Sequence, residues 1–91
     1  MDQQQTLTYG FKLMIKIQIL GSGCAKCQKL AENAEIAARE MGLAYEIEKI
    51  TDIDRIAEFG IMLTPGLAVD GQVKAFGRLL SPDKIRSLLQ G

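Results

Sequence analysis

A short stretch in the first third of the chain changes its hydrophobic period from that of a strand to that of a helix. Residues 13–20 alternate, and Leu13, Ile15, Ile17 and Ile19 share one face. Glycines 21 and 23 follow this run. From Cys24 to Met41, apolar residues then recur at helical spacing: Cys27, Leu30, Ala31, Ala34, Ala37, Ala38 and Met41. The pattern predicts a strand followed directly by a helix, with two cysteines near the junction.

A second strand and a short helix are predicted next. Ala44–Ile50 has the composition of a strand, and Gly42 before it is well placed to end the preceding helix. Thr51 is a candidate N-cap for a short helix, because aspartates follow it, and Gly60 is the candidate end. The residues expected to face inward on this helix are Ile53, Ile56 and Ala57.

The last third of the chain predicts a hairpin and a final helix. Asp70-Gly71 lies between the apolar runs 67–69 and 72–76, as in a tight hairpin turn. Ser81-Pro82-Asp83 has the order cap, proline and acid that begins a helix, with Ile85, Leu88 and Leu89 on its buried side. The element order is therefore β-α-β-α-β-β-α. We expect an α/β fold with a four-stranded mixed sheet and helices on both faces.

The size of the chain limits it to one domain. It has 91 residues, which is enough for a single core but not for two. Residues 1–12 begin with a polar, glutamine-rich stretch that offers little to bury. We expect residues 1–12 to form an N-terminal extension, which can be disordered, and residues 13–91 to form the domain.

Charge and hydropathy exclude several classes of protein. Eleven basic residues balance eleven acidic ones, whereas a general nucleic-acid binder needs a basic surface. No stretch approaches the roughly 20 apolar residues of a membrane helix, and residues 1–8 do not resemble a signal peptide. We therefore expect a cytoplasmic monomer that binds neither nucleic acid nor membrane.

The Cys24-Ala25-Lys26-Cys27 motif is the feature with the clearest chemistry. At the start of a helix, free backbone N–H groups and the helix dipole stabilise a thiolate, and the pKa of a cysteine falls from about 8.5 to roughly 3.5–7.5 in such settings. Lys26 adds a nearby positive charge, and Gly23, in the glycine-rich loop before the helix, is the other candidate supporting residue. Cys27 is expected one turn deeper and less accessible. Cys24 is thus the candidate nucleophile and Cys27 the candidate resolving thiol.

Two other functions remain open for the same pair of cysteines. Two thiolates at this spacing can bind Cu(I) or form half of a zinc site, so a soft-metal carrier or sensor is the alternative. Copper chaperones of the heavy-metal-associated class have a hairpin directly after the first helix, whereas this chain has a strand and a helix there. A closed zinc site needs further ligands, and the chain has no histidine. A binding module that has lost turnover is the third possibility.

In these motifs the chain resembles the thioredoxin superfamily, and more narrowly its small redox-active disulfide proteins. The shared pieces are residues 15–20, Gly23 to Cys27, Thr64-Pro65 and the hairpin at Asp70-Gly71, and the resemblance covers nearly all of residues 14–90. It implies a thioredoxin-like fold and a thioredoxin- or glutaredoxin-like dithiol–disulfide oxidoreductase without a cofactor or a bound metal. Its partners would be protein disulfides and a flavin-dependent or other thiol reductase.

The resemblance also assigns a role to Thr64 and Pro65. It implies that Pro65 follows a cis peptide bond beside the dithiol, and that the Thr64 backbone pairs with an extended substrate segment. The chain departs from thioredoxins proper in two places. Gly23 stands where they have tryptophan, and the first strand has Lys16 and Gln18 as its polar residues instead of a buried aspartate. The proton acceptor for Cys27 is therefore not identified by the sequence.

Overall fold

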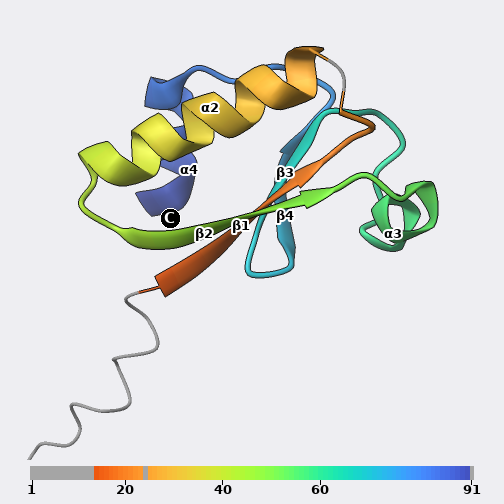
Figure 1. Cartoon of the computed structure of the whole chain (residues 1–91), viewed down its shortest axis with the longest axis horizontal. Helices are drawn as coiled ribbons and strands as arrows, with labels where there is room; N and C mark the ends of the chain where they lie inside the picture. Colours follow the sequence, from red (N-terminus) through yellow and green to blue (C-terminus); the bar gives the residue numbers. More distant parts are fainter. Residues whose placement is uncertain (1–13, 24, 91) are drawn as a thin grey trace, which may run out of the picture.

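The computed structural model describes residues 14–23 and 25–90, which form an α/β fold of four strands and three helices (Figure 1). The strands are β1 (Met14–Leu20), β2 (Ala44–Ile50), β3 (Gly66–Val69) and β4 (Gln72–Phe76). The helices are α2 (Ala25–Glu40), α3 (Ile53–Glu58) and α4 (Pro82–Gln90). This order confirms the predicted β-α-β-α-β-β-α arrangement.

The four strands form one mixed sheet in the order β2-β1-β3-β4. β1 runs parallel to β2, with Ile17 opposite Ile47, and antiparallel to β3, with Ile17 opposite Val69. β3 and β4 form the expected antiparallel hairpin, although its register shifts between Leu67 and Ala68. The parallel pair needs the long crossover through α2, because two parallel strands cannot be joined by a tight turn.

Helices cover both faces of the sheet, as predicted. The larger core cluster contains Ile17 and Ile19 of β1, together with buried residues of α2 and Ile85 of α4. Figure 1 shows these two helices over the same side of the sheet. The smaller cluster combines Leu20 and Ile50 with residues of the α3 region: Ile56 and Ile61. Alternate residues of β1 therefore serve two separate cores.

The buried face of α2 agrees with the predicted apolar stripe, with one polar addition. Its buried residues are Cys27, Leu30, Ala31, Asn33, Ala34, Ala37 and Ala38. The small alanine side chains allow the helix to approach the sheet closely. Asn33 is buried because its Nδ2 donates a hydrogen bond of 2.9 Å to the carbonyl oxygen of Leu80. The helix ends at Glu40, just before the predicted Met41, and Gly42 follows with a positive φ of 70°.

The short helix α3 corrects two sequence predictions. Asp52, and not Thr51, is the N-cap, since its carboxylate accepts a hydrogen bond of 2.9 Å from the backbone N–H of Asp54. Ile56 faces inward, but Ile53 is 76% exposed and Ala57 is also exposed. A helix of six residues makes fewer than two turns, so only a narrow stripe of it reaches the core.

The hairpin turn and the start of α4 are as predicted. Asp70 and Gly71 both have positive φ, 51° and 86°, which is the backbone geometry of a two-residue hairpin turn. The Ser81 hydroxyl accepts a hydrogen bond from the backbone N–H of Lys84, and Pro82 is the first residue of α4. Ile85 is fully buried, while Leu88 and Leu89 pack against the same core from partly buried positions.

Three predictions fall on residues outside the described part of the chain. These are the expected N-terminal extension, residues 1–12, the placement of Leu13 on the first strand, and the nucleophile Cys24. Within residues 14–23 and 25–90, every helix is too short or too polar to pass through a lipid bilayer.

Candidate functional site

The site begins where β1 ends and the chain turns into α2. Gly21 is buried, and its backbone N–H donates a hydrogen bond of 3.0 Å to the carbonyl oxygen of Ile50, which holds the turn against β2. Gly23 has a φ of 89°, a conformation that favours glycine over any residue with a side chain. Its carbonyl oxygen accepts a hydrogen bond of 3.1 Å from Gln28 Nε2. The loop before the helix is thus fixed from both sides.

Cys27 lies on the first turn of α2 and faces inward. Its side chain is only 4% exposed. A Cβ atom added at Gly21 would overlap with the Cys27 sulphur and would lie 3.8 Å from the Cβ of Thr64. The turn after β1, the start of α2 and the segment before β3 therefore meet around this sulphur.

The Thr64–Pro65 segment forms the other wall of the site. The peptide bond between these residues is cis, as the resemblance implied. Pro65 is buried, and its carbonyl oxygen accepts a hydrogen bond of 2.8 Å from the backbone N–H of Gly77. Thr64 is exposed, and no backbone hydrogen bond joins it to another described residue.

A small cavity of about 20 Å³ lies beside Cys27, and its lining includes Gln28, Lys49 and Thr51. This volume is close to the minimum that holds one water molecule. Lys49 pairs with Ile19 across the β1–β2 ladder, so it projects on the α2 side of the sheet. The alternation of β2 places Lys49 on the same face as Tyr45 and Ile47, but sequence reasoning did not identify Lys49 as a residue of the site.

An exposed apolar surface borders the site on its other side. A cavity of about 280 Å³ is lined by Ser22 and Thr64 and by apolar residues that include Ile53 and Met62. Met62 is 93% exposed, and the neighbouring Leu63 is 60% exposed. Large apolar side chains at such exposure are typical of a contact surface for another molecule when they adjoin a site.

The polar residue that replaces the buried aspartate of thioredoxins is engaged elsewhere. Gln18 is buried, and its amide accepts a hydrogen bond of 2.8 Å from the Gly71 N–H and donates one of 3.2 Å to Glu48. The hydrogen bond from Gln18, with a contact of 3.3 Å from Arg55, lowers the pKa of Glu48 against the opposing effect of burial. A neutral amide does not accept a proton at ordinary pH, so Gln18 is not the base for Cys27.

The segments that hold the predicted site residues meet where β1 ends and β3 begins, and these residues are Gly23, Cys27, Thr64 and Pro65. Lys26 is exposed on the first turn of α2, and no hydrogen bond or ion pair joins it to another described residue. Among residues 14–23 and 25–90, no group of three or more cysteine, aspartate or glutamate side chains could hold a metal ion.

Comparison with known proteins agrees with this geometry. The family model described as thioredoxin domain matches residues 15–90. A curated protein named thioredoxin from Methanothermobacter thermautotrophicus is 50% identical over 76 residues, which cover 84% of this chain and 99% of the relative. A thioredoxin from Methanocaldococcus jannaschii is 38% identical over 79 residues, with 87% and 91% of the two chains covered.

A solved structure described as "Structure of a malarial protein" shares the fold. It superposes with a TM-score of 0.60 at 13% identity and covers 85% of this chain and 94% of its own. At this identity the likeness concerns the fold alone. The family match and the two archaeal relatives concern the sequence itself, and with them the chain belongs to the thioredoxin domain family as a thioredoxin-like oxidoreductase.

Proposed function

We propose that this protein reduces disulfide bonds in partner proteins, with Cys24 as the nucleophile and Cys27 as the resolving thiol. The observation that carries the proposal is the position of Cys27. Its sulphur is buried at the start of α2 between Gly21 and the Thr64–Pro65 segment. Since α2 begins at Ala25, Cys24 directly precedes the helix in the chain, where backbone N–H groups favour a thiolate.

The reaction proceeds in two exchange steps. The Cys24 thiolate attacks one sulphur of the client disulfide, which forms a mixed disulfide and releases the other client sulphur as a thiolate that takes up a proton. Cys27 then loses its proton and attacks the sulphur of Cys24. The mixed disulfide breaks, the second client thiol leaves, and a Cys24–Cys27 disulfide remains. Two electrons have passed from the dithiol to the client.

The surroundings of the dithiol support a protein as the client. Thr64 is exposed and makes no backbone hydrogen bond to another described residue, so in this proposal its N–H and C=O pair with an extended segment of the client. The apolar cavity lined by residues that include Ser22 and Met62 accepts side chains of the client segment. In this proposal Thr64 and Pro65 bind the substrate, while Gly23 and Lys26 support the nucleophile.

The proposed electron donor and cellular location follow from the redox chemistry of the Cys24–Cys27 pair. The oxidised pair must regain two electrons, and a flavin-dependent or other thiol reductase supplies them. The protein itself needs no cofactor for the exchange. A cytoplasmic location supports this direction of electron flow, because the cytosol keeps thiols reduced. A monomer would leave the apolar surface around Met62 open to clients.

Insulin reduction by dithiothreitol tests the proposed activity. The wild-type protein is expected to accelerate the appearance of reduced insulin chains, and Cys24→Ser is expected to abolish the acceleration. In a separate incubation without dithiothreitol, pre-reduced Cys27→Ser keeps the nucleophile but cannot resolve, so it should accumulate a mixed disulfide with insulin that is visible on a non-reducing gel. The thiol pKa of Cys24 is expected below that of a free cysteine.

Several outcomes of these experiments would contradict the proposal. One is a purified protein that carries stoichiometric Cu(I) or zinc and does not reduce insulin. Another is a Cys24→Ser variant as active as the wild type. A Cys27→Ser variant that traps no client would remove the assigned division of labour, even if the wild type were active.

A further inference from the structure

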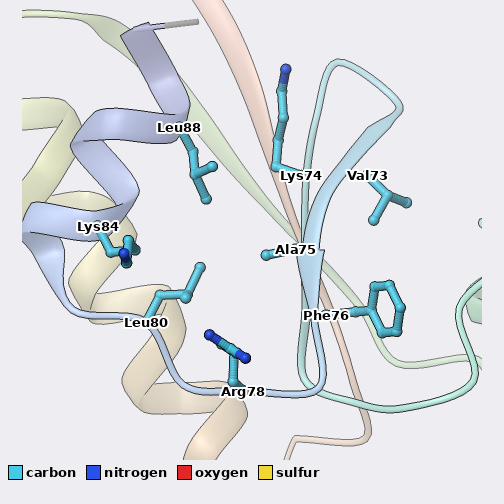
Figure 2. Close-up of a pocket in the computed structure, with 8 residues that line it drawn as sticks. All are labelled: Val73, Lys74, Ala75, Phe76, Arg78, Leu80, Lys84 and Leu88. Atoms are coloured by element: carbon cyan, nitrogen blue, oxygen red, sulfur yellow. The ribbon is translucent and has the colours of Figure 1, made fainter.

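Another cavity, separate from the two beside the dithiol, lies between the last strand and the last helix, on the α2 and α4 side of the sheet. Its volume is about 420 Å³. Figure 2 shows Ala75 pointing from β4 toward α4, with Leu80 and Leu88 pointing into the space between these elements. The three side chains give the cavity an apolar floor. Leu80 is buried, while Ala75 and Leu88 are partly buried, so the floor is continuous with the main core.

The rim of this cavity is positively charged. Lys74, Arg78 and Lys84 line it, and none of the described residues in its lining is acidic. Figure 2 shows the Arg78 guanidinium pointing toward Leu80. In a chain with eleven basic and eleven acidic residues, three cations around one apolar cavity are a local concentration of charge. A ligand that complements this cavity carries a negative charge next to an apolar body.

The three cations are not neutralised within the described part of the chain. Lys74 donates a hydrogen bond to Gln72, which is uncharged, and neither Arg78 nor Lys84 forms an ion pair with a described residue. The neighbouring acid on α4, Asp83, pairs with Arg86, which also pairs with Glu40 from α2. The charge of the rim is therefore available to a ligand.

The shape of β4 favours a small molecule over an added peptide strand. β4 is an edge strand, but its ladder with β3 is irregular at Leu67–Ala68, where Val73 and Ala75 pair with consecutive residues and Lys74 is left out. An irregular edge that carries a lysine discourages pairing with another strand. A volume of about 420 Å³ lies in the range of pockets for small ligands, roughly 300–1,000 Å³.

We propose that this cavity, independently of the dithiol, binds a small amphipathic anion, namely a carboxylate with an aliphatic tail. The tail lies on Ala75, Leu80 and Leu88, where it removes apolar surface from water. The carboxylate lies at the rim, where the planar guanidinium of Arg78 matches its two oxygens and Lys84 adds a second cation.

Decanoate is a suitable probe, and decanol is its uncharged match. Titration of the full chain, followed by backbone amide chemical shifts, should map decanoate to residues 74–80 and 84–88. Decanol is expected to bind about tenfold more weakly, because it lacks the charge-assisted contacts. Butyrate has the same charge but a short tail, and it is expected to bind more weakly than decanoate because it buries less apolar surface. Decanoate affinity should fall as salt is added.

Three variants separate charge from shape. The double variant Arg78→Gln/Lys84→Gln should weaken decanoate binding by about tenfold. Ala75→Leu fills the cavity from its floor and should weaken the binding of both decanoate and decanol. Lys29→Gln, an exposed lysine of α2 that pairs with Glu32, is the matched control and should bind decanoate as the wild type does. Urea unfolding of each variant checks that it is folded, and this control does not depend on the proposed insulin reduction.

The proposal is overturned by any of three results. Decanol could bind as tightly as decanoate, or the shifts could map to the apolar surface at Met62 and Leu63 instead of this cavity. Alternatively, decanoate could fail to bind while an acidic, leucine-rich peptide shifts the amides of β4, which would make the cavity a protein contact.

Discussion

At Gly21 the backbone passes close to the Cys27 sulphur, and any side chain there would overlap with it. Gly21→Ala is therefore expected to displace Cys27 or the Thr64 segment. Overpacking of this kind lowers the free energy of unfolding by about 1–3 kcal/mol. The rate of insulin reduction should fall further than this loss of stability explains, because the resolving sulphur has moved.

The control for this prediction is Ile17→Val, which removes one methylene from the main core away from the dithiol. It is expected to lower stability by about 0.5–1.5 kcal/mol. Urea unfolding gives the stability of each variant, and insulin reduction in the absence of urea gives its activity. If both variants lost activity in proportion to stability, Gly21 would have no specific role at the site.

Lys49 is the charged residue that lines the small cavity beside Cys27. A positive charge near a thiol favours its thiolate, and the resolving step requires the thiolate of Cys27. Lys49→Met is expected to slow insulin reduction by about 3- to 10-fold at pH 7 and less at higher pH, where the thiolate forms without help. Lys29→Met is the matched control. An unchanged pH profile for Lys49→Met would exclude this role.

At the scale of elements, Asn33 connects α2 to the segment before α4. Its side chain is buried and donates to the Leu80 carbonyl oxygen at 2.9 Å. Asn33→Ala leaves that buried acceptor without a partner, so it should lower the free energy of unfolding by about 1–3 kcal/mol. Glu32→Ala, at the exposed neighbouring position, should change it by less than about 0.5 kcal/mol. Urea unfolding of both variants makes the comparison, and equal losses would contradict the prediction.

Local signals predicted most of the elements, because each signal has a local physical cause. Asp70-Gly71 marked the hairpin, since both residues adopt positive φ. Ser81-Pro82 marked the start of α4 for a similar reason. The prediction that Ile53 faces inward was wrong. A helix of six residues is oriented mainly by the loops around it, so the spacing of its apolar residues does not determine which of them are buried.

The candidate site was predictable to a smaller extent. The spacing of the cysteines and the burial expected for Cys27 follow from one helical turn. The resemblance, and not the residues themselves, pointed to Thr64 and Pro65. Sequence reasoning missed the close approach at Gly21 and the cavity at Lys49, because both depend on how β1, β2 and α2 are brought together over long sequence separations.

On the scale of the whole molecule, the positive and negative charges balance, so the pH dependence of stability is set by particular ionisable groups. With eleven basic and eleven acidic residues, general repulsion at neutral pH is small. Glu48 on β2 is instead a point where three elements meet. It accepts hydrogen bonds from Gln18 of β1 and Arg55 of α3. Gln18 in turn accepts from the Gly71 N–H in the hairpin turn, so the network spans the α3 side of the sheet.

This network predicts how stability depends on pH. The Gln18 hydrogen bond, followed by Arg55 and Lys16, holds the pKa of Glu48 below its ordinary value of 4.5, although burial opposes the shift. The folded state therefore favours the ionised form, so Glu48 stabilises the fold above pH 4.5. That contribution is lost as the pH falls through the lower pKa of the folded state. Glu48→Gln should thus be less stable than the wild type at pH 7, and urea unfolding should show the difference in stability shrinking in acid.

Glu46→Gln, at an exposed position of the same strand, is the control, and its stability difference from the wild type should not shrink in acid. A difference for Glu48→Gln that stayed constant with pH would contradict the linkage.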